Sequence, residues 1–416
     1  MLKSLADPAL WREFLAYKQS GGHLSREDEK ALVEFVETEG YLPAVETILR
    51  GESFAPPKKK AISKMHSGKK RIVYTYAEDE NWVLKLLTYL LQRKYDGIFA
   101  DNLYSFRRGK GVREAVKKLT GTPNIRQMWA YKVDISNYFN SVPVEQLLPL
   151  LRETLKEDPQ VYHFLELLLR NPLVDDNGAL IPEEKGIMAG TPVSTFLANL
   201  YLNHMDHYFA DSGALYARYS DDIIVFGITE EMREKQIKRI HDFLSDAGLT
   251  VNPNKEERTA PGEMWNFLGI CYCDGMIDVA PVSVEKLKAK MHRKARALVR
   301  WRARKGATGL QAAKAFVRVF NRKLFENPVE HELTWARWYF PLINTTRSLK
   351  ILDAYIQGCI RYLATGKRTK AAYNFRYEQM KELGYISLVN CYYKKDTNEN
   401  SRKDSCDTHG ISENVG

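Results

Sequence analysis

Two adjacent aspartates, Asp221 and Asp222, lie between two apolar, strand-like segments of the chain. The sequence from Arg218 to Phe226 reads RYSDDIIVF, which predicts two strands joined by a tight turn. Two like charges in such a position repel each other, and removal from water raises the free energy of both charged forms. A fold that keeps this pair must therefore leave the turn in solvent or provide a cation beside it.

A third carboxylate, Asp134, ends another strand-like run that begins at Tyr131. Mg²⁺ favours carboxylate oxygens and keeps positions for water and substrate phosphates. If Asp134 lies beside the 219–222 turn, three carboxylates could hold two ions that clamp the attacking and leaving oxygens of an in-line phosphoryl displacement. The alternative is a solvated hairpin tip without chemistry.

Length and composition set the broad class of the protein. The 416 residues carry 62 Lys and Arg against 52 Asp and Glu, a formal net charge of +10, and the length suits roughly two to three subdomains. No apolar run approaches the roughly 20 residues that cross a bilayer, and charges interrupt the start of the chain where a signal peptide needs an apolar stretch. We therefore expect a soluble cytoplasmic protein with no membrane partner.

The five cysteines show no paired CxxC spacing, which argues against a disulfide framework or a structural zinc site. For Cys271 and Cys273 we expect ordinary packing and no redox role.

Hydrophobic periodicity gives a coarse map of the chain. Short helices fill the first 55 residues, the second capped by Ser25. We expect a basic segment over 58–71 that leads into a strand over 71–76, further strands over 131–134 and 217–227, and a hairpin over 174–180. Helices are expected over 82–91, 147–169 and 191–207 and from 282 onward, followed by a Tyr-rich helical unit over 346–393 and a polar, disordered tail from Lys394.

The segment 281–323 is strongly basic, with 14 Lys and Arg against one acid, Glu285. Such a helical face binds phosphates without sequence preference, although a charge run can also be a solvated surface. The predicted nucleic-acid contacts are Lys286, Lys290, Arg293, Lys294, Arg296, Arg300, Arg302 and Arg304.

Six segments, in order between about residues 60 and 280, resemble the motifs of prokaryotic, group II intron-like reverse transcriptases. Residues 219–222 resemble the YxDD turn, and 132–142 resemble the motif that carries the first catalytic aspartate. The others are the fingers-like 104–115, the template and nucleotide-contact segment 186–202, the palm segment 248–255 and the primer-grip segment 266–269. Within 186–202 the chain departs from the family, because Met188-Ala189-Gly190 replaces Pro-Gln-Gly and no glutamine side chain is present to position a nucleotide.

The resemblance implies roles for matching residues. Asp134, Asp221 and Asp222 would be the catalytic, metal-holding carboxylates, together with the backbone carbonyl of Ile135. Two Mg²⁺ ions, which Mn²⁺ could replace, would be the cofactors.

The resemblance also implies a nucleotide site. Arg71 would grip the incoming triphosphate, or be a surface cation; a guanidinium fork suits phosphate oxygens. Phe139 would exclude a 2′-hydroxyl, or belong to the core. Gly190 would lie at the nucleotide, and Lys255 would donate a proton to pyrophosphate or stay solvated. Phe267, Leu268 and Gly269 would form the primer grip.

The implied fold is an α+β right-hand polymerase. Its parts would be an N-terminal helical region (1–57), fingers (58–130), a palm with an antiparallel sheet and inserted fingers elements (131–280), a basic helical thumb (281–345), a helical C-terminal extension (346–393) and a disordered tail (394–416).

The implied activity is RNA-directed DNA synthesis from dNTPs on an RNA template, giving cDNA. A compact polymerase followed by a short Tyr-rich extension most resembles the bacterial defence-associated (unknown-group) reverse transcriptases, class 2 in particular, which implies antiphage defence with a dedicated noncoding RNA as template. The alternatives are a mobile-element reverse transcriptase (group II intron-like or retron-like), an RNA-dependent RNA polymerase, which Phe139 disfavours, and a non-catalytic RNA-binding or splicing-helper protein.

Overall fold

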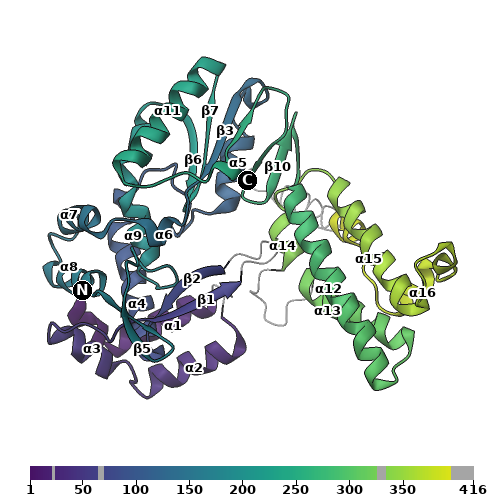
Figure 1. The fold of residues 1–416 in the computed structure, drawn as a ribbon, viewed down its shortest axis with the longest axis horizontal. Helices are drawn as coiled ribbons and strands as arrows, with labels where there is room; N and C mark the ends of the chain where they lie inside the picture. Colours follow the sequence, from purple (N-terminus) through teal and green to yellow (C-terminus); the bar gives the residue numbers. More distant parts are fainter. Residues whose placement is uncertain (21–23, 64–69, 326–333, 395–416) are drawn as a thin grey trace, which may run out of the picture. The chain divides into compact units, whose positions relative to one another are not determined.

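The computed structural model describes residues 1–20, 24–63, 70–325 and 334–394 (Figure 1). The chain forms two compact units, Met1–Leu268 and Gly269–Gly416, and each is described by itself. No helix in the described ranges is long and apolar enough to span a bilayer. The tail predicted from Lys394 lies outside these ranges from residue 395 onward.

The first unit begins with helices around an aromatic core. These are η1 (Leu2–Ala6), α1 (Pro8–Ser20), α2 (Arg26–Glu37) and α3 (Leu42–Leu49). Trp11 and Tyr41 are fully buried and stack with ring centroids 4.6 Å apart. The Ser25 hydroxyl accepts a hydrogen bond from the Asp28 N–H at 3.0 Å, which confirms the predicted cap of α2.

A four-stranded sheet, in the order β2-β1-β4-β5, contains the predicted 71–76 strand as β2 and the predicted hairpin, and it adds a strand, β1, that was not predicted within the basic segment. Its strands are β1 (Lys58–Ser63), β2 (Lys70–Thr75), β4 (Leu173–Asp176) and β5 (Ala179–Pro182). The turn residues Asn177 and Gly178 both have positive φ, 56° and 92°, as a two-residue Asn-Gly turn requires. The buried helix α4 (Glu78–Tyr95) includes the predicted 82–91 segment and extends past it at both ends.

A second four-stranded sheet has the order β6-β7-β3-β8, with every neighbouring pair antiparallel. Its strands are β3 (Trp129–Asp134), β6 (Leu215–Tyr219), β7 (Asp222–Gly227) and β8 (Glu257–Thr259). Helix α11 (Glu230–Asp246) packs against β7 and β3 (Figure 1). Helices α5 (Val112–Thr120) and α10 (Asn203–Asp211) pack against β6. The α+β class and the antiparallel palm sheet are confirmed.

Two predicted helices are interrupted. The 147–169 segment forms α7 (Val144–Thr154) and α8 (Pro159–Arg170), because Pro159 lacks an N–H and disfavours helical backbone at the residue before it. The 191–207 segment forms α9 (Ser194–Tyr201) and α10, separated at Leu202. Shorter elements complete the unit: η2 (Asp96–Ile98), η3 (Ile125–Gln127), α6 (Tyr138–Ser141), η4 (Pro253–Lys255) and β9 (Trp265–Phe267).

The second unit is helical, apart from a hairpin of β10 (Ile270–Cys273) and β11 (Met276–Val279). Its helices are α12 (Pro281–Lys305), α13 (Gly309–Leu324), α14 (Trp335–Tyr339), α15 (Arg347–Thr365), η5 (Lys370–Asn374), α16 (Tyr377–Glu382) and a last helix over 388–394. Helices α12, α13 and α15 pack against one another. Cys271 is buried, and its thiol donates to the Val279 carbonyl at 3.7 Å.

Buried Asp353 fixes the end of the second unit. Its carboxylate accepts hydrogen bonds from the Tyr385 hydroxyl (2.7 Å), the Ser387 hydroxyl (2.7 Å) and the backbone N–H groups of Leu388 (2.9 Å) and Val389 (3.1 Å). A carboxylate at a helix N-terminus satisfies free N–H groups. Asp353 therefore anchors the 388–394 helix to α15.

Candidate active site

Antiparallel pairing brings the predicted aspartates to one end of the palm sheet. Asp134, the last residue of β3, is paired directly with Asp222, the first residue of β7, and directly opposed side chains lie on the same face of a sheet. Asp221 lies in the turn before Asp222, and its carbonyl accepts a hydrogen bond from the Ile135 N–H at 3.0 Å. Two segments almost ninety residues apart thus meet at one point.

The 219–222 turn has an unusual backbone conformation. Tyr219 and Asp222 form the last pair of the β6–β7 hairpin, so Ser220 and Asp221 alone make the turn. Ser220 has φ +59°, in the left-handed region that costs a non-glycine residue on the order of 1 kcal/mol. The surrounding structure must compensate for this strain.

The carboxylates stand in a strongly negative, half-enclosed environment. Burial, and then the charge of Asp134, raises the pKa of Asp221. Burial, and then the charge of Asp221, raises the pKa of Asp222 to about 6. One cation offsets this charge at contact distance, since the Lys255 ammonium Nζ lies 2.5 Å from Asp134 Oδ2.

The donor set fits a hard divalent cation. As they stand, no three His, Cys, Asp or Glu side chains within the described ranges converge closely enough to enclose a metal ion. The three aspartates offer only oxygen donors, however. The charges of Lys255, Lys132 and Arg71 act on Asp221 or Asp222, yet the pKa of both carboxyl groups stays raised. Mg²⁺ takes one or two carboxylates and completes its shell with water and substrate phosphates, so an open carboxylate set suits it.

The raised pKa of Asp222 predicts a pH-dependent stability in metal-free protein. The folded-state pKa of about 6 lies above the unfolded value of about 3.9, so the folded state binds the extra proton between these values. The free energy of unfolding should therefore fall by about 2 kcal/mol from this group as pH rises from about 4 to about 6, and then level off.

Urea titrations in EDTA across this pH range measure the effect as the difference between wild type and Asp222→Asn. The variant should be the more stable protein at pH 7. Asp246→Asn, which changes an exposed aspartate of the same unit, serves as the control and should follow wild type. A wild-type-minus-variant difference that is constant with pH would contradict the assigned environment of Asp222.

A buried polar network lies beneath the turn. Arg218, fully buried, donates from Nε to Asp206 Oδ1 at 2.8 Å and from Nη2 to Asp206 Oδ2 at 2.5 Å. The same guanidinium donates to the carbonyls of Ser220 and Asn199, each at 3.2 Å. Because the Asp206 carboxylate fixes the guanidinium, the guanidinium in turn fixes the carbonyl of the strained residue Ser220.

Ser105 binds the other backbone polar group of Ser220, its N–H. Its hydroxyl accepts a hydrogen bond from the Ser220 N–H at 2.9 Å and donates to Asn199 Oδ1 at 2.9 Å, while Asn199 Nδ2 donates to the Ser105 carbonyl at 2.8 Å. Ser105, Asn199 and Ser220 are at most 5% exposed. Both backbone polar groups of Ser220 are therefore bound by buried side chains, which compensates for its conformation.

Phe139 lies near the turn within a small aromatic cluster. Phe106 makes edge contacts with Phe139 (ring centroids 6.4 Å apart) and a tilted contact with Tyr219 (6.2 Å). Phe139 is half-buried and packs in part against the core. It thus has features of both predicted roles, since part of the ring is packed and part is exposed.

Strand β2 carries Arg71 and, further along, contacts Gly190 at Val73 and Tyr74. The Tyr74 N–H donates to the Ala189 carbonyl at 2.8 Å, and a Cβ added to Gly190 would come within 3.0 Å of the Tyr74 carbonyl oxygen. Gly190 has φ +102°, so the close approach and the conformation both require glycine. Arg71 is exposed, and its charge acts to lower the pKa of Asp221, so β2 directs a cation toward the carboxylates.

The predicted primer-grip residues form a tight turn. Phe267 is 1% exposed at the end of β9, and Leu268 and Gly269 both have positive φ, 50° and 85°. A Cβ on Gly269 would lie 3.1 Å from the Tyr339 hydroxyl. The turn conformation explains why glycine follows leucine here.

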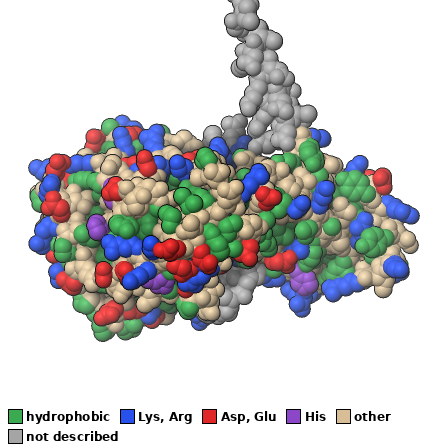
Figure 2. Space-filling view, turned by 90° about the horizontal axis from the view of Figure 1, so that it is seen from above, with side chains coloured by type: hydrophobic (Ala, Val, Ile, Leu, Met, Phe, Trp, Pro, Cys, Tyr) green, Lys and Arg blue, Asp and Glu red, His purple; other side chains and the backbone are tan. Residues whose placement is uncertain are grey.

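Helix α12 separates the predicted nucleic-acid contacts into groups. Helical spacing places five on one face: Lys286, Lys290, Arg293, Arg300 and Arg304. Burial lowers the pKa of Lys290, and the nearby charges of Lys323, Arg293 and Lys286 lower it further, so positive charge is crowded along this face. Figure 2 shows Lys and Arg side chains recurring over the surface that it draws, as the net charge of +10 requires.

The other α12 cations have different surroundings. Arg302 is half-buried and donates to the Leu363 carbonyl of α15 at 3.3 Å. Arg296 lines a cavity against α15, and Lys294 is half-buried. The charge run predicted eight nucleic-acid contacts without distinguishing among them. Packing against α15 gives these eight side chains different exposure and different partners.

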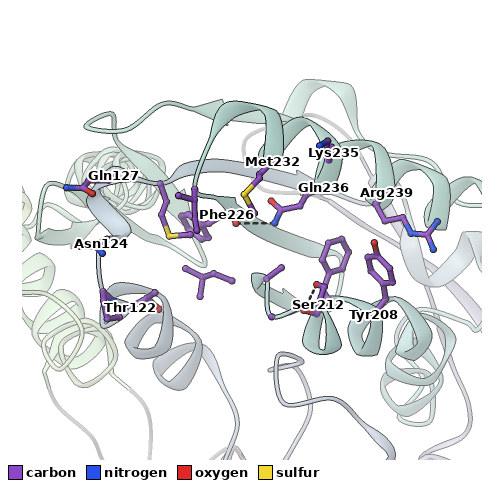
Figure 3. Close-up of a pocket in the computed structure, with 17 residues that line it drawn as sticks. Thr122, Asn124, Gln127, Tyr208, Ser212, Phe226, Met232, Lys235, Gln236 and Arg239 are labelled. Carbon is purple, nitrogen blue, oxygen red and sulfur yellow. Dashed lines mark hydrogen bonds between the residues drawn. The ribbon is translucent and has the colours of Figure 1, made fainter.

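A cavity of about 540 Å³ lies at the other end of the β6–β7 hairpin (Figure 3). Its lining includes Leu215 and Phe226, which pair four positions from the Tyr219–Asp222 pair, or about 13 Å along the strands. Gln236 Nε2 donates to the Phe226 carbonyl at 3.2 Å at its edge. The cavity is therefore separate from the aspartate site.

Asp206, Ser105, Asn199 and Phe106 were not among the predicted site residues. Ser105 and Phe106 belong to the fingers-like segment and Asn199 to the 186–202 segment, so their place in family motifs is a sequence signal for a role at the site. Asp206 lies beyond every matched segment. Only the folded chain reveals that it neutralises Arg218.

An antiparallel sheet that carries paired carboxylates at a hairpin turn is typical of a nucleotide polymerase palm. Residues 57–272 match the family model described as "Reverse transcriptase (RNA-dependent DNA polymerase)". The chain belongs to the reverse transcriptase family.

Two curated relatives are fungal intron proteins. The chain is 26% identical over 273 residues to the "Uncharacterized 91 kDa protein in cob intron" of Schizosaccharomyces pombe, covering 50% of this chain and 32% of the relative. It is 29% identical over 131 residues to the "Putative COX1/OXI3 intron 2 protein" of Saccharomyces cerevisiae, covering 31% and 15%. The chain thus spans a third or less of the length of these relatives.

Similar solved structures include telomerases. Apo telomerase from Candida tropicalis matches with a TM-score of 0.44 and 13% identity, covering 79% of this chain and 59% of that one. Telomerase from Candida albicans in complex with a fragment of telomeric RNA matches with a TM-score of 0.43 and 12% identity, covering 84% and 66%.

Proposed function

We propose that this protein is an RNA-directed DNA polymerase whose active site is the Asp134, Asp221 and Asp222 cluster. The observation that carries the proposal is the pairing of Asp134 with Asp222 beside the 220–221 turn, inside the residues that match the family. The substrates are an RNA template, a primer and dNTPs, and the products are cDNA and pyrophosphate.

In the proposed reaction the primer 3′-hydroxyl attacks the α-phosphorus of a dNTP. A bond forms between that oxygen and phosphorus, and the bond to the bridging oxygen of pyrophosphate breaks. Asp134, Asp221 and Asp222, with the Ile135 carbonyl, would hold two Mg²⁺ ions, or Mn²⁺ in their place. When bound, the ions supply charge stabilisation at the attacking and leaving oxygens.

The chain's own residues bind and orient the reactants. Arg71 is assigned to the triphosphate, since it is exposed on β2 and its charge acts on Asp221. The Gly190 backbone is assigned to the nucleotide, and Lys255, already in contact with Asp134, to the phosphates and the departing pyrophosphate. Phe267, Leu268 and Gly269 are assigned to the primer, and the exposed α12 cations to the nucleic-acid backbone.

In the same proposal the domains take the polymerase names. Residues 58–130 are fingers, 131–280 palm and 281–345 thumb, with a helical region before them and an extension after them.

The test of this function is extension of a primer on an RNA template by purified protein with dNTPs and Mg²⁺. Incorporation directed by the template supports the proposal. Extension with NTPs alone would favour an RNA-dependent RNA polymerase. Tight RNA binding by a protein that incorporates neither dNTPs nor NTPs would favour a non-catalytic RNA-binding role.

Phe139→Ala is expected to lower the preference for dNTPs over NTPs by about tenfold or more, because a smaller side chain leaves room for a 2′-hydroxyl; tenfold corresponds to about 1.4 kcal/mol. Single-nucleotide incorporation with dNTP and NTP in parallel gives the ratio. Phe106→Ala, which removes a ring that contacts Phe139, is the companion variant and should have a smaller effect. An unchanged ratio in Phe139→Ala would leave Phe139 with a core role alone.

For the biological role we propose antiphage defence with a dedicated noncoding RNA as template, as the resemblance to defence-associated reverse transcriptases implies. Sequencing of RNA and DNA that co-purify with the protein from its host tests this. One discrete RNA with complementary DNA supports a dedicated template, whereas intron RNA would favour a mobile element.

A further inference from the structure

A cavity of about 340 Å³ lies in the second unit between α12, α15 and the 367–373 segment. All of its lining lies outside residues 57–272, which match the reverse transcriptase family. Of the lining residues, only Arg296 is among the α12 cations proposed to contact the nucleic-acid backbone. Its volume lies within the range of about 300–1,000 Å³ that is usual for small-molecule sites.

The cavity is lined by positive charge without negative charge. Arg296, Arg361, Lys367 and Arg368 contribute side chains, and the lining contains no Asp or Glu. None of these four cations forms an ion pair in the part of the chain that the structure describes. Arg361 donates from Nε to the Phe375 carbonyl at 3.3 Å, which leaves its charge without a counter-ion. Four cations without an ion pair around one cavity favour an anionic ligand.

Aromatic rings accompany these cations. The Arg361 guanidinium lies 4.6 Å from the ring centroid of Tyr373, and the Arg368 guanidinium lies 4.5 Å from that of Tyr362. Tyr373 is 64% exposed although it is a large apolar ring. Flat rings and guanidinium planes are the surfaces on which unpaired nucleobases stack.

We propose that this cavity binds an unpaired nucleotide of a single-stranded RNA, with the base against Tyr362 or Tyr373 and a phosphate against Arg361 and Arg368. A base within a duplex is already stacked and cannot enter, and an acidic peptide would use the charge but not the rings. The site does not rest on the proposed polymerase activity, because it needs neither the aspartates nor dNTPs.

The experiment uses the full-length protein in EDTA, without dNTPs, and a 12-nucleotide RNA that carries one 2-aminopurine. Stacking of this base on an aromatic ring quenches its fluorescence. Tyr373→Leu is expected to lower the affinity measured by quenching by about 5-fold to 100-fold, since stacking on an aromatic ring contributes this much per base. Arg368→Gln is expected to lower it by about tenfold or more, because it removes a charged hydrogen-bond donor to the phosphate. Both residues are exposed, so the variants should fold, which thermal melting verifies.

Lys350→Gln is the matched control. It removes an exposed cation from α15 that does not line the cavity, and it should leave the quenching titration unchanged. Arg368→Gln should also reduce the dependence of log affinity on log salt by about 0.7, as expected for one lost phosphate contact on a single strand.

Competitors identify the ligand. Displacement by unlabelled single-stranded RNA, with little effect of duplex RNA, AMP or inorganic phosphate, supports the proposal. If AMP or phosphate displaces the labelled RNA as effectively as the unlabelled strand does, the ligand is not a polynucleotide strand. If single-stranded DNA displaces it equally well, the site does not select RNA. Two results would overturn the nucleotide site itself. One is quenching that is unchanged in both Tyr373→Leu and Arg368→Gln, and the other is displacement of the labelled RNA by polyglutamate as effective as displacement by unlabelled single-stranded RNA.

Discussion

Replacing Asp221 and Asp222 together by alanine is expected to lower RNA-templated DNA synthesis by at least about a thousandfold. The two carboxylates lie side by side at the hairpin turn, opposite Asp134. Without them the charge that develops on the reacting phosphate loses its stabilisation, and loss of one such electrostatic interaction alone costs about a hundredfold to a thousandfold. Primer extension with saturating dNTPs and Mg²⁺ measures the loss.

The same variant should fold and bind RNA. Burial raises the pKa of both Asp221 and Asp222, so each charge opposes folding at neutral pH, and their removal should raise the thermal unfolding midpoint. The cations of α12 remain, and RNA affinity should change little. A gain in stability with a loss of activity is typical of residues kept for function.

The control is a double variant of equal charge change, Asp211→Ala with Asp246→Ala. Both aspartates are exposed at the ends of α10 and α11 in the same unit, and activity should stay within about twofold of wild type. Template-directed extension by a folded Asp221→Ala/Asp222→Ala protein at more than a small fraction of the control rate would refute the active-site assignment.

The elements that the sequence predicted correctly are those with strong local signals. The 217–227 hairpin and the 71–76 strand have apolar periodicity or a turn signal within a few residues, and Ser25 is a cap by its residue type and position. Strand β1 was missed, because its lysines hide the β pattern. The predicted continuous helix 147–169 was wrong near Asp158. Apolar periodicity continues across Pro159, but the helical hydrogen bonding of the backbone does not. The interruption at Leu202 had no proline or glycine to mark it.

The surroundings of the candidate site depend on long-range contacts. Ser105 and Asn199, which bind each other and the turn, are 94 residues apart. Helical spacing already places Arg302 on another face of α12 than Arg300, but only the folded chain shows that the Arg302 side chain binds the Leu363 carbonyl. Composition thus predicted a basic surface, whereas the packing of α15 determined which cations face solvent.

Breaking the buried Arg218–Asp206 ion pair is expected to have the largest effect on stability. Arg218→Met removes the guanidinium and leaves the Asp206 carboxylate, which is 0% exposed, without a counter-charge. An uncompensated buried charge of this kind costs about 3–5 kcal/mol. Urea unfolding of the variant at pH 7 measures it.

Arg233→Met is the matched control. Arg233 is also a buried arginine, but its partners Glu230 and Glu234 are 58% and 48% exposed, so water can solvate them when the arginine is lost. The expected cost is about 1 kcal/mol. Equal destabilisation by Arg218→Met and Arg233→Met would contradict the role of burial in the Arg218 pair.

A double variant, Arg218→Met with Asp206→Leu, separates stability from positioning. Removing both charges should recover part of the lost stability, since apolar replacement of a buried ion pair is often neutral, whereas the buried Tyr216 hydroxyl then loses its acceptor, Asp206 Oδ1. It does not restore the hydrogen bonds from the guanidinium to the Ser220 and Asn199 carbonyls, so Ser220 keeps only the contact of its N–H with Ser105.

For this double variant we therefore expect a stable protein with kcat for incorporation reduced by about tenfold to a hundredfold, since small displacements of positioning groups have effects of this size. The KM for dNTP should change little, because Arg71 and Gly190 are untouched. Wild-type kcat in this double variant would show that the network stabilises the palm without positioning Asp221 and Asp222, whereas a stable but slow enzyme would show that the strained turn is held in place for catalysis.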